Sequence, residues 1–573
     1  MSTERGSQLG PAQRTAALDR MADESFDIAV IGAGVTGAGA ALDAASRGLS
    51  VALIEQRDLA SGTSSRSSKL IHGGLRYLEQ LNFRLVMEAL RERGLMLDRL
   101  APHLVKPVSF LYPLQHRVWE RAYVGSGVLI YDLLAATGPN PLPRHRHLSR
   151  SRALELIPAL RKDTLVGGIR YWDAQVDDAR HTMMIARTAA RHGAAVASSM
   201  RAIGFVRTGD KVAGVEAMDL ESGRSVSIRA RQVINATGVW TDIVQDLAGR
   251  GSIKVTASKG IHLVVPKARI ASETGMIIRT EKSVLFLVPW GGHWIIGTTD
   301  TSWDLDLAHP AASSSDIAYL LDHINGVLEE PLSPQDIEGV YAGLRPLLTG
   351  ESDATSRLSR EHAVSVSVPG LVTVAGGKYT TYRVMARDAV DVAVESFAEP
   401  VAPSSTAETP ILGADGFHAM WNARHALARR SGLEPATVER LLNRYGTEIE
   451  DVIRLIADRP ELGAPLDGGG DYLAAEVVYA TTHEAALHLD DVLTRRTRIS
   501  IEVADRGLRA AEAAAPLMAG VLGWDGATIE RELTHYRARV SAERESQTKP
   551  DDLTADAARH GAPDVRTGTN RDR

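Results

Sequence analysis

The residues best suited to chemistry lie in one segment, Asp58 to Glu79, which reads DLASGTSSRSSKLIHGGLRYLE. Its serine and threonine hydroxyls can donate hydrogen bonds to a phosphate or to ring oxygens, and the glycine pair after His72 lets backbone approach a flat ligand. Histidine titrates near neutral pH, which suits it to proton transfer. Lys69, His72 and Arg76 fall within eight residues, between apolar positions, which argues against the alternative of a solvated serine-rich loop.

Charged residues in other segments complete the list of candidates. Arg345 lies in YAGLRPL, Lys378 follows a glycine pair in GGKYTTYR, and Arg360 lies between them. Arginine binds phosphate or carboxylate groups through a forked pair of donors and a permanent charge. His262 lies on an alternating apolar segment, SKGIHLVVP, where a lone histidine is usually a structural residue of a strand.

A dinucleotide-binding pattern precedes these candidates, from Phe26 to Glu55 (FDIAVIGAGVTGAGAALDAASRGLSVALIE). A short apolar run predicts a buried parallel strand. Gly32, Gly34 and Gly37 then complete the G-x-G-x-x-G turn, which brings backbone and a helix N-terminus to a pyrophosphate. The next predicted strand ends at Glu55, whose carboxylate can accept hydrogen bonds from a ribose and argues against NADP. This pattern alone does not decide between NAD and FAD.

Length and composition limit the class of protein. A chain of 573 residues exceeds one hydrophobic core, so two or three domains are expected. A net charge of -6 gives no general attraction to nucleic acid or to anionic membranes. The absence of cysteine excludes disulfides, iron–sulfur clusters and a redox-active cysteine pair, and no metal site is expected. The polar N-terminus is not a secretory signal, and no apolar run predicts a spanning helix.

Eight segments, in this order, resemble the FAD-dependent glycerol-3-phosphate dehydrogenases, the aerobic respiratory flavoenzymes: IGAGVTGAG, GTSSRSSKLIHGGLRYLE, WDAQVDDAR, INATGVW, SKGIHLVVP, IIGTTD, YAGLRPL and GGKYTTYR. The matches run from about residue 26 to 390 and continue more weakly to about 540. The resemblance implies an α/β fold with a Rossmann-type FAD-binding domain of the glutathione-reductase or D-amino-acid-oxidase kind. It also implies an antiparallel-sheet substrate domain and a C-terminal α-helical domain.

The same segments set the expected domain boundaries, and composition sets the ends. A Pro- and Ser-containing stretch predicts a linker, helical periodicity dominates after it, and polar termini predict disorder. The expected units are a disordered N-terminal extension (1–25), a discontinuous FAD-binding domain (26–100, 165–250 and 340–395), a substrate-binding domain (101–164 and 251–339), a linker (396–410), a C-terminal helical domain (411–545) and a disordered tail (546–573).

The resemblance further implies the reaction. The substrate is sn-glycerol 3-phosphate, which is oxidised to dihydroxyacetone phosphate by hydride transfer from C2 to N5 of FAD. His72 is the expected base, with His262 as the second candidate, and a role for His72 in holding the flavin alone stays open. Arg76 and Arg345 are expected on the phosphate or on adjacent substrate oxygens.

The remaining expected site residues contact the substrate or the cofactor. Arg360 is a weaker candidate for the phosphate, Tyr77 completes the pocket, and Lys378 lies near the flavin and the substrate oxygen. A helix that begins after Gly376 and Gly377 is expected to point its N-terminus at the flavin. The expected FAD contacts are Gly32, Gly34, Val35, Thr36, Gly37, Glu55, Gln56, Thr63, Ser64, Ser67, Lys69, Leu70, His72, Ala202, Ala236, Gly238, Gly377, Lys378 and Thr380.

Only one G-x-G-x-x-G turn is convincing, so electrons are expected to pass from FAD to a quinone rather than to NAD. The family attaches peripherally to the cytoplasmic face of the inner membrane, which favours a cytoplasmic, membrane-associated protein. Residues 124–136 form an apolar segment before the basic run PLPRHRHLSRSR, a composition typical of an interfacial anchor. A core helix followed by a solvated loop fits that segment equally well. The oligomeric state is open, with a homodimer as one option.

Three alternatives stay open at this point. A soluble oxidase of the same family would pass electrons to O2, and a related flavoenzyme would oxidise a 2-hydroxy acid or an amino acid. A flavin-binding protein with a structural or sensing role is the third. Two charged groups are interpreted as structural ion pairs rather than metal or acid sites: the first holds Asp173, Asp177, Asp178 and Arg180, and the second holds Asp490, Asp491, Arg495 and Arg496.

Overall fold

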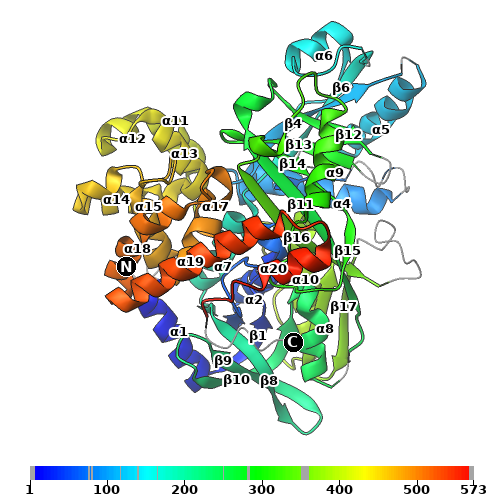
Figure 1. Cartoon of the computed structure of the whole chain (residues 1–573). Helices are drawn as coiled ribbons and strands as arrows, with labels where there is room; N and C mark the ends of the chain where they lie inside the picture. The colour runs from blue at the N-terminus through cyan, green and yellow to red at the C-terminus, as the bar shows by residue number, and fades with distance from the viewer. Residues whose placement is uncertain are drawn as a thin grey trace.

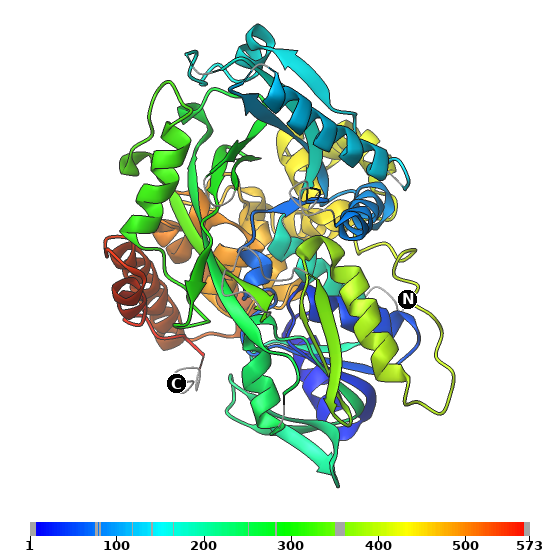
Figure 2. The same cartoon turned by 90° about the vertical axis from the view of Figure 1, so that its right-hand side faces the viewer.

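The computed structural model describes residues 7–74, 78, 82–116, 118–138, 141–163, 165–249, 251–280, 284–349 and 361–566. These residues form two sheets, each with its own helices, and a helical unit near the C-terminus (Figures 1 and 2). The expected class is confirmed: an α/β domain, a second domain built on a mainly antiparallel sheet, and a C-terminal helical domain.

The first sheet has eight strands, which are β1 (Ser25–Ile31), β2 (Val51–Ile54), β7 (Ala195–Ala197), β8 (Met200–Thr208), β9 (Lys211–Asp219), β10 (Ser225–Asn235), β17 (His362–Val368) and β18 (Leu371–Gly376). Strands β18, β10, β1, β2 and β7 are parallel neighbours in that order. β2, β7 and β18 are buried along their whole length, β1 is buried from Ile28 and β10 from Gln232, so the centre of the sheet is covered on both faces, as in a doubly wound fold. β17 and the β8–β9 hairpin extend the sheet with antiparallel pairs.

Helices cover both faces of this sheet. On one face lie α2 (Val35–Ser46), α7 (Asp178–Arg191) and α10 (Tyr382–Val394), whose alanines and methionines share one hydrophobic cluster with β1 and β2. On the other face lie α1 (Pro11–Asp23) and α8 (Thr241–Leu247). The glycine turn between β1 and α2 therefore opens at the carboxyl edge of the parallel strands, where doubly wound sheets bind their ligands.

The second sheet has ten strands, which are β3 (Leu70–Ile71), β4 (Lys106–Leu114), β5 (Arg146–Ser149), β6 (Gly167–Gln175), β11 (Val255–Pro266), β12 (Gly275–Arg279), β13 (Val284–Trp290), β14 (His293–Gly297), β15 (Thr301–Trp303) and β16 (Gly339–Leu348). All pairs in it are antiparallel except β4 with β12. Its helices are α4 (Phe83–Leu95), α5 (Trp119–Ala135), α6 (Arg150–Leu156) and α9 (Ser314–Asn325).

Three strands correct the expected domain boundaries. The sequence places β3, β6 and β16 within the FAD-binding ranges, yet all three pair inside the second sheet. Strand pairing is non-local, so an apolar run does not reveal which of two sheets it joins. The chain consequently crosses between the two domains more often than expected, and the loop before β3 lies at their junction.

The C-terminal unit is helical, as expected. Irregular chain joins α10 to it, and two hydrophobic clusters form its core. Its helices are α11 (Phe417–Asn422), α12 (Arg424–Ser431), α13 (Pro435–Tyr445), α14 (Ile449–Asp458), α15 (Ala474–His483), α16 (Leu489–Asp491), α17 (Ile499–Glu502), α18 (Leu508–Leu522), α19 (Gly526–Ser546) and α20 (Asp552–Arg559).

The prediction of disordered ends is wrong for the residues that the structure describes. At the N-terminal end, α1 buries Ala17 and Met21 against the first sheet. At the C-terminal end, α20 packs along α19 and over the second domain (Figure 1). The fully buried Lys259 of β11 pairs with Asp552 of α20 and with Asp316 of α9. These contacts are long-range ion pairs and apolar packing, which composition does not reveal.

Candidate functional site

The glycine turn between β1 and α2 fits a dinucleotide. Gly32 has a left-handed backbone (φ 97°), and a Cβ on Gly37 would lie 1.8 Å from the Gly32 carbonyl oxygen, so both positions require glycine. Ile31 at the end of β1 pairs with Asn235, and a Cβ on Gly32 would lie 2.9 Å from the Ala236 carbonyl oxygen, so the chain after β10 lies beside the turn. The predicted cofactor contacts Ala236 and Gly238 belong to this stretch, and their role stays a prediction. Because backbone lines this turn, a pyrophosphate can approach the N-terminus of α2, where Val35 and Thr36 lie.

Glu55 closes the turn from the end of β2. Its carboxylate accepts the backbone N–H of Ala33 at 2.8 Å and that of Arg57 at 3.0 Å. Burial raises the pKa of Glu55 although both hydrogen bonds act to lower it. The carboxylate lies next to the first glycine of the turn, the position from which it can accept a hydrogen bond from the cofactor's ribose. Gln56 follows it directly.

The predicted adenine contact, Ala202, lies in β8 and pairs with Ala217 in the antiparallel hairpin. Met200 comes nearer to the turn, because its backbone N–H donates to the Glu55 carbonyl at 2.7 Å. Sequence analysis did not select Met200. The hairpin it begins is irregular between Ala202 and Gly204, and a shift in strand register is not visible in residue types.

The serine-rich segment forms a loop between β2 and β3 that we call the flavin loop, residues 58–69. Its single turn η2 (Thr63–Ser65) faces α2, because Ser64 Oγ accepts the Val35 N–H at 2.9 Å. Thr63 Oγ1 donates to the Leu344 carbonyl of β16 at 2.6 Å. The loop therefore lies between the predicted pyrophosphate site and the strand that carries Arg345.

Two predicted cofactor contacts in this loop are occupied by protein partners. The ammonium group of Lys69 lies 2.7 Å from Asp178 Oδ1 and 2.7 Å from the Ser65 carbonyl, and Lys69 is fully buried. Its backbone N–H and carbonyl are bonded to Ser67 Oγ and to the Val176 N–H. Ser67 Oγ also donates to Asp178 Oδ2 at 2.7 Å. These bonds favour a structural role for Lys69 and Ser67.

The two most specific segments meet in space. The His72 backbone N–H donates to Thr380 Oγ1 at 3.1 Å, so HGG lies against GGKYTT. Gly376 and Gly377 are both left-handed (φ 77°), and the turn η8 (Tyr379–Thr381) leads from Lys378 into α10. The α-helix begins at Tyr382, five positions after Gly377 and later than expected, and its N-terminus faces the junction of the two domains.

His262 lies on β11, with Tyr341 of β16 stacked on its ring at 4.6 Å. Its Nε2 is 2.8 Å from Ser68 Oγ, and its Nδ1 is buried without a hydrogen-bond partner among the described residues. Burial lowers the pKa of His262 well below its ordinary value, and the charges of Arg345 and Lys69 lower it further. The imidazole is therefore neutral near pH 7 and able to accept a proton.

Arg345 lies on β16, next to β11, and its side chain is about three-quarters buried. Its guanidinium group donates to Thr298 Oγ1 at 3.1 Å and to the Thr299 carbonyl at 3.2 Å, and it lies 3.4 Å from Asp300. Sequence analysis noted the segment IIGTTD but gave its Thr298 and Asp300 no role. These two side chains orient Arg345 toward β11.

Four more predicted site residues are to be placed. Leu70 is a buried residue of β3. Arg76, Tyr77 and Arg360 lie outside the described residues, so their roles stay predictions.

Both predicted groups of ion pairs are confirmed. Asp177 caps α7, Asp173 pairs with Arg93, and Arg180 pairs with Glu484 of the C-terminal domain. Asp490 and Asp491 pair with Arg495, which with Arg496 also binds Asp58.

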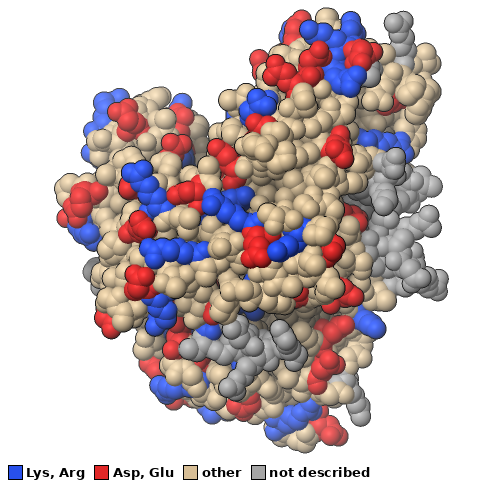
Figure 3. Space-filling model, in the orientation of Figure 1, with Lys and Arg blue, Asp and Glu red and all other residues tan. Residues whose placement is uncertain are grey.

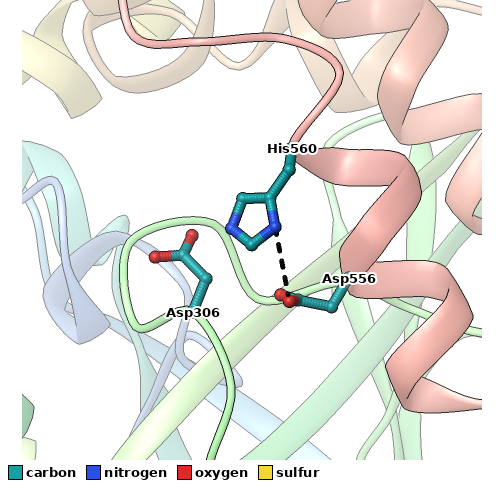
Figure 4. A group of neighbouring side chains, drawn as sticks. All are labelled: Asp306, Asp556 and His560. Atoms are coloured by element: carbon teal, nitrogen blue, oxygen red, sulfur yellow. Dashed lines mark ion pairs between the residues drawn. The ribbon is translucent and has the colours of Figure 1, made fainter. Parts of the chain in front are cut away.

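A group of three residues, Asp306, Asp556 and His560, has metal-ligand types within one small volume (Figure 4). Both Asp306 oxygens accept backbone N–H groups of the adjoining turn, from Ala308 and His309. Asp556 pairs with His560 at 3.6 Å within α20. We assign this group to the contact of α20 with the second domain, because both Asp306 oxygens are bonded to backbone there and Asp556 already pairs with His560.

No helix in the described part of the chain is long and apolar enough to cross a membrane.

Comparison with known proteins agrees with this geometry. The family model "FAD dependent oxidoreductase" matches residues 27–383, and "C-terminal domain of alpha-glycerophosphate oxidase" matches residues 404–529. The chain is 56% identical to "Glycerol-3-phosphate dehydrogenase 2" of Mycobacterium tuberculosis, over 97% of this chain and 95% of that one. It is 36% identical to the human "Glycerol-3-phosphate dehydrogenase, mitochondrial", over 95% of this chain and 77% of that one.

A solved glycerol-3-phosphate dehydrogenase from Bacillus halodurans, complexed with FAD, superposes with a TM-score of 0.77 and 28% sequence identity. The superposition covers 93% of this chain and 98% of that one. With the glycine turn, Glu55 and the flavin loop in place, the cofactor is FAD. The chain belongs to the family of FAD-dependent glycerol-3-phosphate dehydrogenases.

Proposed function

We propose that this protein oxidises sn-glycerol 3-phosphate to dihydroxyacetone phosphate with FAD as its cofactor. Relatives that bear the name glycerol-3-phosphate dehydrogenase along the whole chain support FAD-linked oxidation of this substrate. The observation that carries the proposal is the 2.8 Å contact between Ser68 Oγ of the flavin loop and His262 Nε2 of the substrate sheet. It brings a neutral imidazole and, on the neighbouring strand, the cationic Arg345 to the loop that is expected to bind the flavin.

Two histidines can accept the proton of the substrate's C2 hydroxyl. His72 is our first choice, because its backbone is fixed to Thr380 between two glycine pairs. His262 is the second: its ring lies beside Ser68 of the flavin loop and is neutral, but burial lowers its pKa and makes it the weaker base. When bound, FAD supplies the acceptor for the hydride that leaves C2. The protein's task is to orient that carbon and to remove the hydroxyl proton.

The phosphate group needs cations at a fixed distance from the reacting carbon. Arg345 is proposed to bind it, since Thr298 and Asp300 already hold the guanidinium group in place. Arg76 and Arg360 are proposed to share this task and Tyr77 to complete the pocket. Lys378 is proposed to favour the anionic reduced flavin and to polarise the substrate oxygen.

A substrate panel tests this assignment. With a dye as electron acceptor, glycerol 3-phosphate is expected to be oxidised, whereas glycerol, lactate and glycine are expected to react at least a hundredfold more slowly in kcat/KM. Faster oxidation of lactate or glycine would favour the rival reading, a flavoenzyme for 2-hydroxy acids or amino acids. Comparable rates for glycerol and glycerol 3-phosphate would contradict the proposal that Arg345 binds the substrate phosphate.

We further propose that a membrane quinone accepts the electrons. α4 and α5 lie side by side on the face that is turned to the viewer in Figure 2. Many of the exposed side chains of these two helices are apolar. Contiguous exposed apolar residues of this kind typically mark an interaction surface. The apolar patch, as we call it, consists of Phe83, Met87, Val118, Trp119, Tyr123, Leu129, Ile130 and Leu133.

Basic residues adjoin the apolar patch. Arg144 and Arg146 are exposed between α5 and α6, and Arg150 and Arg152 are exposed in the first turn of α6. Figure 3 shows Lys and Arg side chains, with acidic ones beside them, at the end of the molecule that α6 forms. An amphipathic helix followed by exposed arginines supports peripheral binding to an anionic, cytoplasmic membrane face. α5 also has a buried face, with Val128 and Tyr131, which is compatible both with an interfacial anchor and with a core helix.

The rival acceptor is O2, as in a soluble oxidase. Stopped-flow reoxidation of the reduced enzyme distinguishes the two. A quinone analogue is expected to reoxidise it at least a hundredfold faster than air-saturated buffer does. Equal rates would favour the oxidase.

A further inference from the structure

We propose that three arginines of the C-terminal domain, Arg495, Arg496 and Arg498, are positioning residues for FAD. They hold the flavin loop, residues 58–69, from the side opposite the glycine turn. The inference rests on the proposed placement of FAD against this loop. It assigns the C-terminal domain a part in cofactor binding, although none of its residues belongs to the predicted FAD contacts.

The first end of the loop is fixed at Asp58. This side chain is fully buried, and Arg496 binds its two oxygens with separate nitrogens at 2.6 and 2.7 Å. Arg495 Nε lies 2.5 Å from Asp58 Oδ2. Such a forked pair sets the direction of the carboxylate as well as its distance. Asp58 is the first residue of the loop after the ribose-binding Glu55 and its neighbours.

The second end is fixed at Asp178, the first residue of α7. Arg498 Nη2 lies 2.6 Å from Asp178 Oδ1, and Arg498 Nη1 donates to the Ser65 carbonyl at 3.2 Å. Lys69 binds the same Asp178 oxygen, while the Ser67 N–H and hydroxyl donate to the other. The loop from Ser65 to Lys69 is thus wrapped around one buried carboxylate, which Lys69 pairs with from within the loop and Arg498 from the C-terminal domain.

The loop needs this external support because its own backbone is strained. Ala60 and Lys69 are non-glycine residues with left-handed backbone (φ 63° and 61°), a conformation that persists only where the surroundings enforce it. Within the loop, the only helical or strand element is the short turn η2, and β3 begins directly after the loop ends. The inner side of the loop meanwhile carries Ser64, bonded to Val35 of α2, and Ser68, bonded to His262.

The same C-terminal segment also contacts the substrate sheet. A Cβ on Gly339 of β16 would lie 2.3 Å from the Ile501 carbonyl oxygen, so α17 packs directly on that strand. Trp290 at the end of β13 donates to Glu502 at 2.7 Å. Residues 495–502 therefore touch both the flavin loop and the substrate sheet, and they fix the distance between the two.

If Arg495, Arg496 and Arg498 only stabilised the fold, other buried arginines between the FAD-binding domain and the C-terminal domain would do the same. Arg187 of α7 is fully buried and reaches Tyr479 and Glu448 of the C-terminal domain. Its remaining partners among the described residues are Ser7, Met184 and Glu484, which lie outside the flavin loop. Arg187→Met is therefore the matched control for Arg498→Met. Both variants lose a buried cation at the same boundary, and only one of them faces the loop.

The test is titration of deflavinated protein with FAD, without substrate, followed by flavin absorbance and fluorescence. Folding of each variant is checked by circular dichroism and thermal unfolding. Arg498→Met and Arg496→Met are expected to raise the Kd for FAD at least tenfold, which corresponds to about 1.4 kcal/mol. Arg187→Met is expected to leave the Kd within about twofold at a similar loss of melting temperature. Saturating FAD is expected to restore turnover in Arg498→Met at least in part.

Wild-type FAD affinity in folded Arg498→Met and Arg496→Met would overturn the inference. An equal loss of FAD affinity in Arg187→Met would show that the effect comes from a general loss of stability and not from the flavin loop. If the methionine variants do not fold, Arg498→Lys keeps the charge but not the fork, and an unchanged Kd there would also overturn it. Substrate-independent FAD binding keeps this test separate from the proposed function: wild type that binds FAD but is not reduced by glycerol 3-phosphate refutes the latter alone.

Discussion

Ser68 Oγ and His262 Nε2 lie 2.8 Å apart, which joins the flavin loop of one domain to strand β11 of the other. Burial lowers the pKa of this imidazole, the nearby charges of Arg345 and Lys69 lower it further, and the ring is therefore neutral. A proton acceptor is thus kept available where the two domains meet. The first two predictions concern this junction.

His72→Asn is expected to lower kcat by about a hundredfold to ten-thousandfold, the range for loss of a general base. FAD should stay bound, because the His72 contact with Thr380 is made by the backbone. His262→Asn is expected to lower kcat by less than tenfold. Steady-state kinetics at saturating glycerol 3-phosphate measures both, and the reverse order would make His262 the base.

Arg345→Ala is expected to lower kcat/KM for glycerol 3-phosphate by about 2 to 5 kcal/mol, the range for removing one partner of a desolvated charge pair. The same substitution should change the rate with unphosphorylated glycerol by much less, because the lost partner is the phosphate. The two-substrate comparison is the control. A similar loss with both substrates would place Arg345 outside the phosphate site.

Gly37→Ala is expected to abolish FAD binding, because the added methyl group would overlap the Gly32 carbonyl. Gly520→Ala in α18 is the matched control, since a Cβ there meets no atom within 4 Å and alanine favours helix. Flavin released by denaturation, counted per protein chain, is the measurement. Full flavin content in folded Gly37→Ala would contradict the placement of the pyrophosphate.

The apolar patch on α4 and α5 predicts binding to lipid. Leu129→Glu together with Leu133→Glu is expected to reduce sedimentation with anionic vesicles at least fivefold while leaving dye-linked turnover intact. Ile243→Glu is the control, because Ile243 of α8 is similarly exposed but lies on the FAD-binding domain. If the wild type, the double variant and Ile243→Glu bind vesicles equally, the apolar patch is not the membrane-binding surface.

His488 predicts how stability depends on pH. Burial and Arg566 act to lower the pKa of His488, but Glu221 and Glu532 prevail and raise it to about 9 from 6.5. The folded protein then holds a proton that the unfolded chain loses above about pH 6.5. This contribution, about 3 kcal/mol, is complete below pH 6.5 and is lost as pH rises through 9. Urea unfolding across this range should show the decline, and His488→Gln should flatten it; an equal decline in both would contradict the assignment.

Features encoded over short distances were predictable from the sequence. The glycine turn and Glu55 depend on neighbouring residues and backbone conformation, and the structure places them as expected. The helix after Gly377 is present too, although it begins later than expected, at Tyr382. The meeting of HGG with GGKYTT rested on resemblance, because 304 positions separate His72 from Gly376 in the chain and spacing alone does not join them.

Features that depend on distant partners were not predictable. Pairing of β3 and β16 within the substrate sheet requires knowledge of both partner strands. The residue type of Lys69 suggested a cofactor ligand, but its ammonium group forms an ion pair with Asp178. The tail has a polar composition typical of disorder, yet Lys259 and the second domain hold α20. In each case a contact across the fold outweighs the local signal.

The central claim is best tested by one anaerobic experiment. The purified protein should show the visible absorption of oxidised flavin, and addition of glycerol 3-phosphate without oxygen should bleach it within the time of turnover. Glycerol at the same concentration should not. A yellow protein that glycerol 3-phosphate does not bleach would contradict the proposed substrate, and a colourless protein that releases no flavin on denaturation would contradict the cofactor site itself.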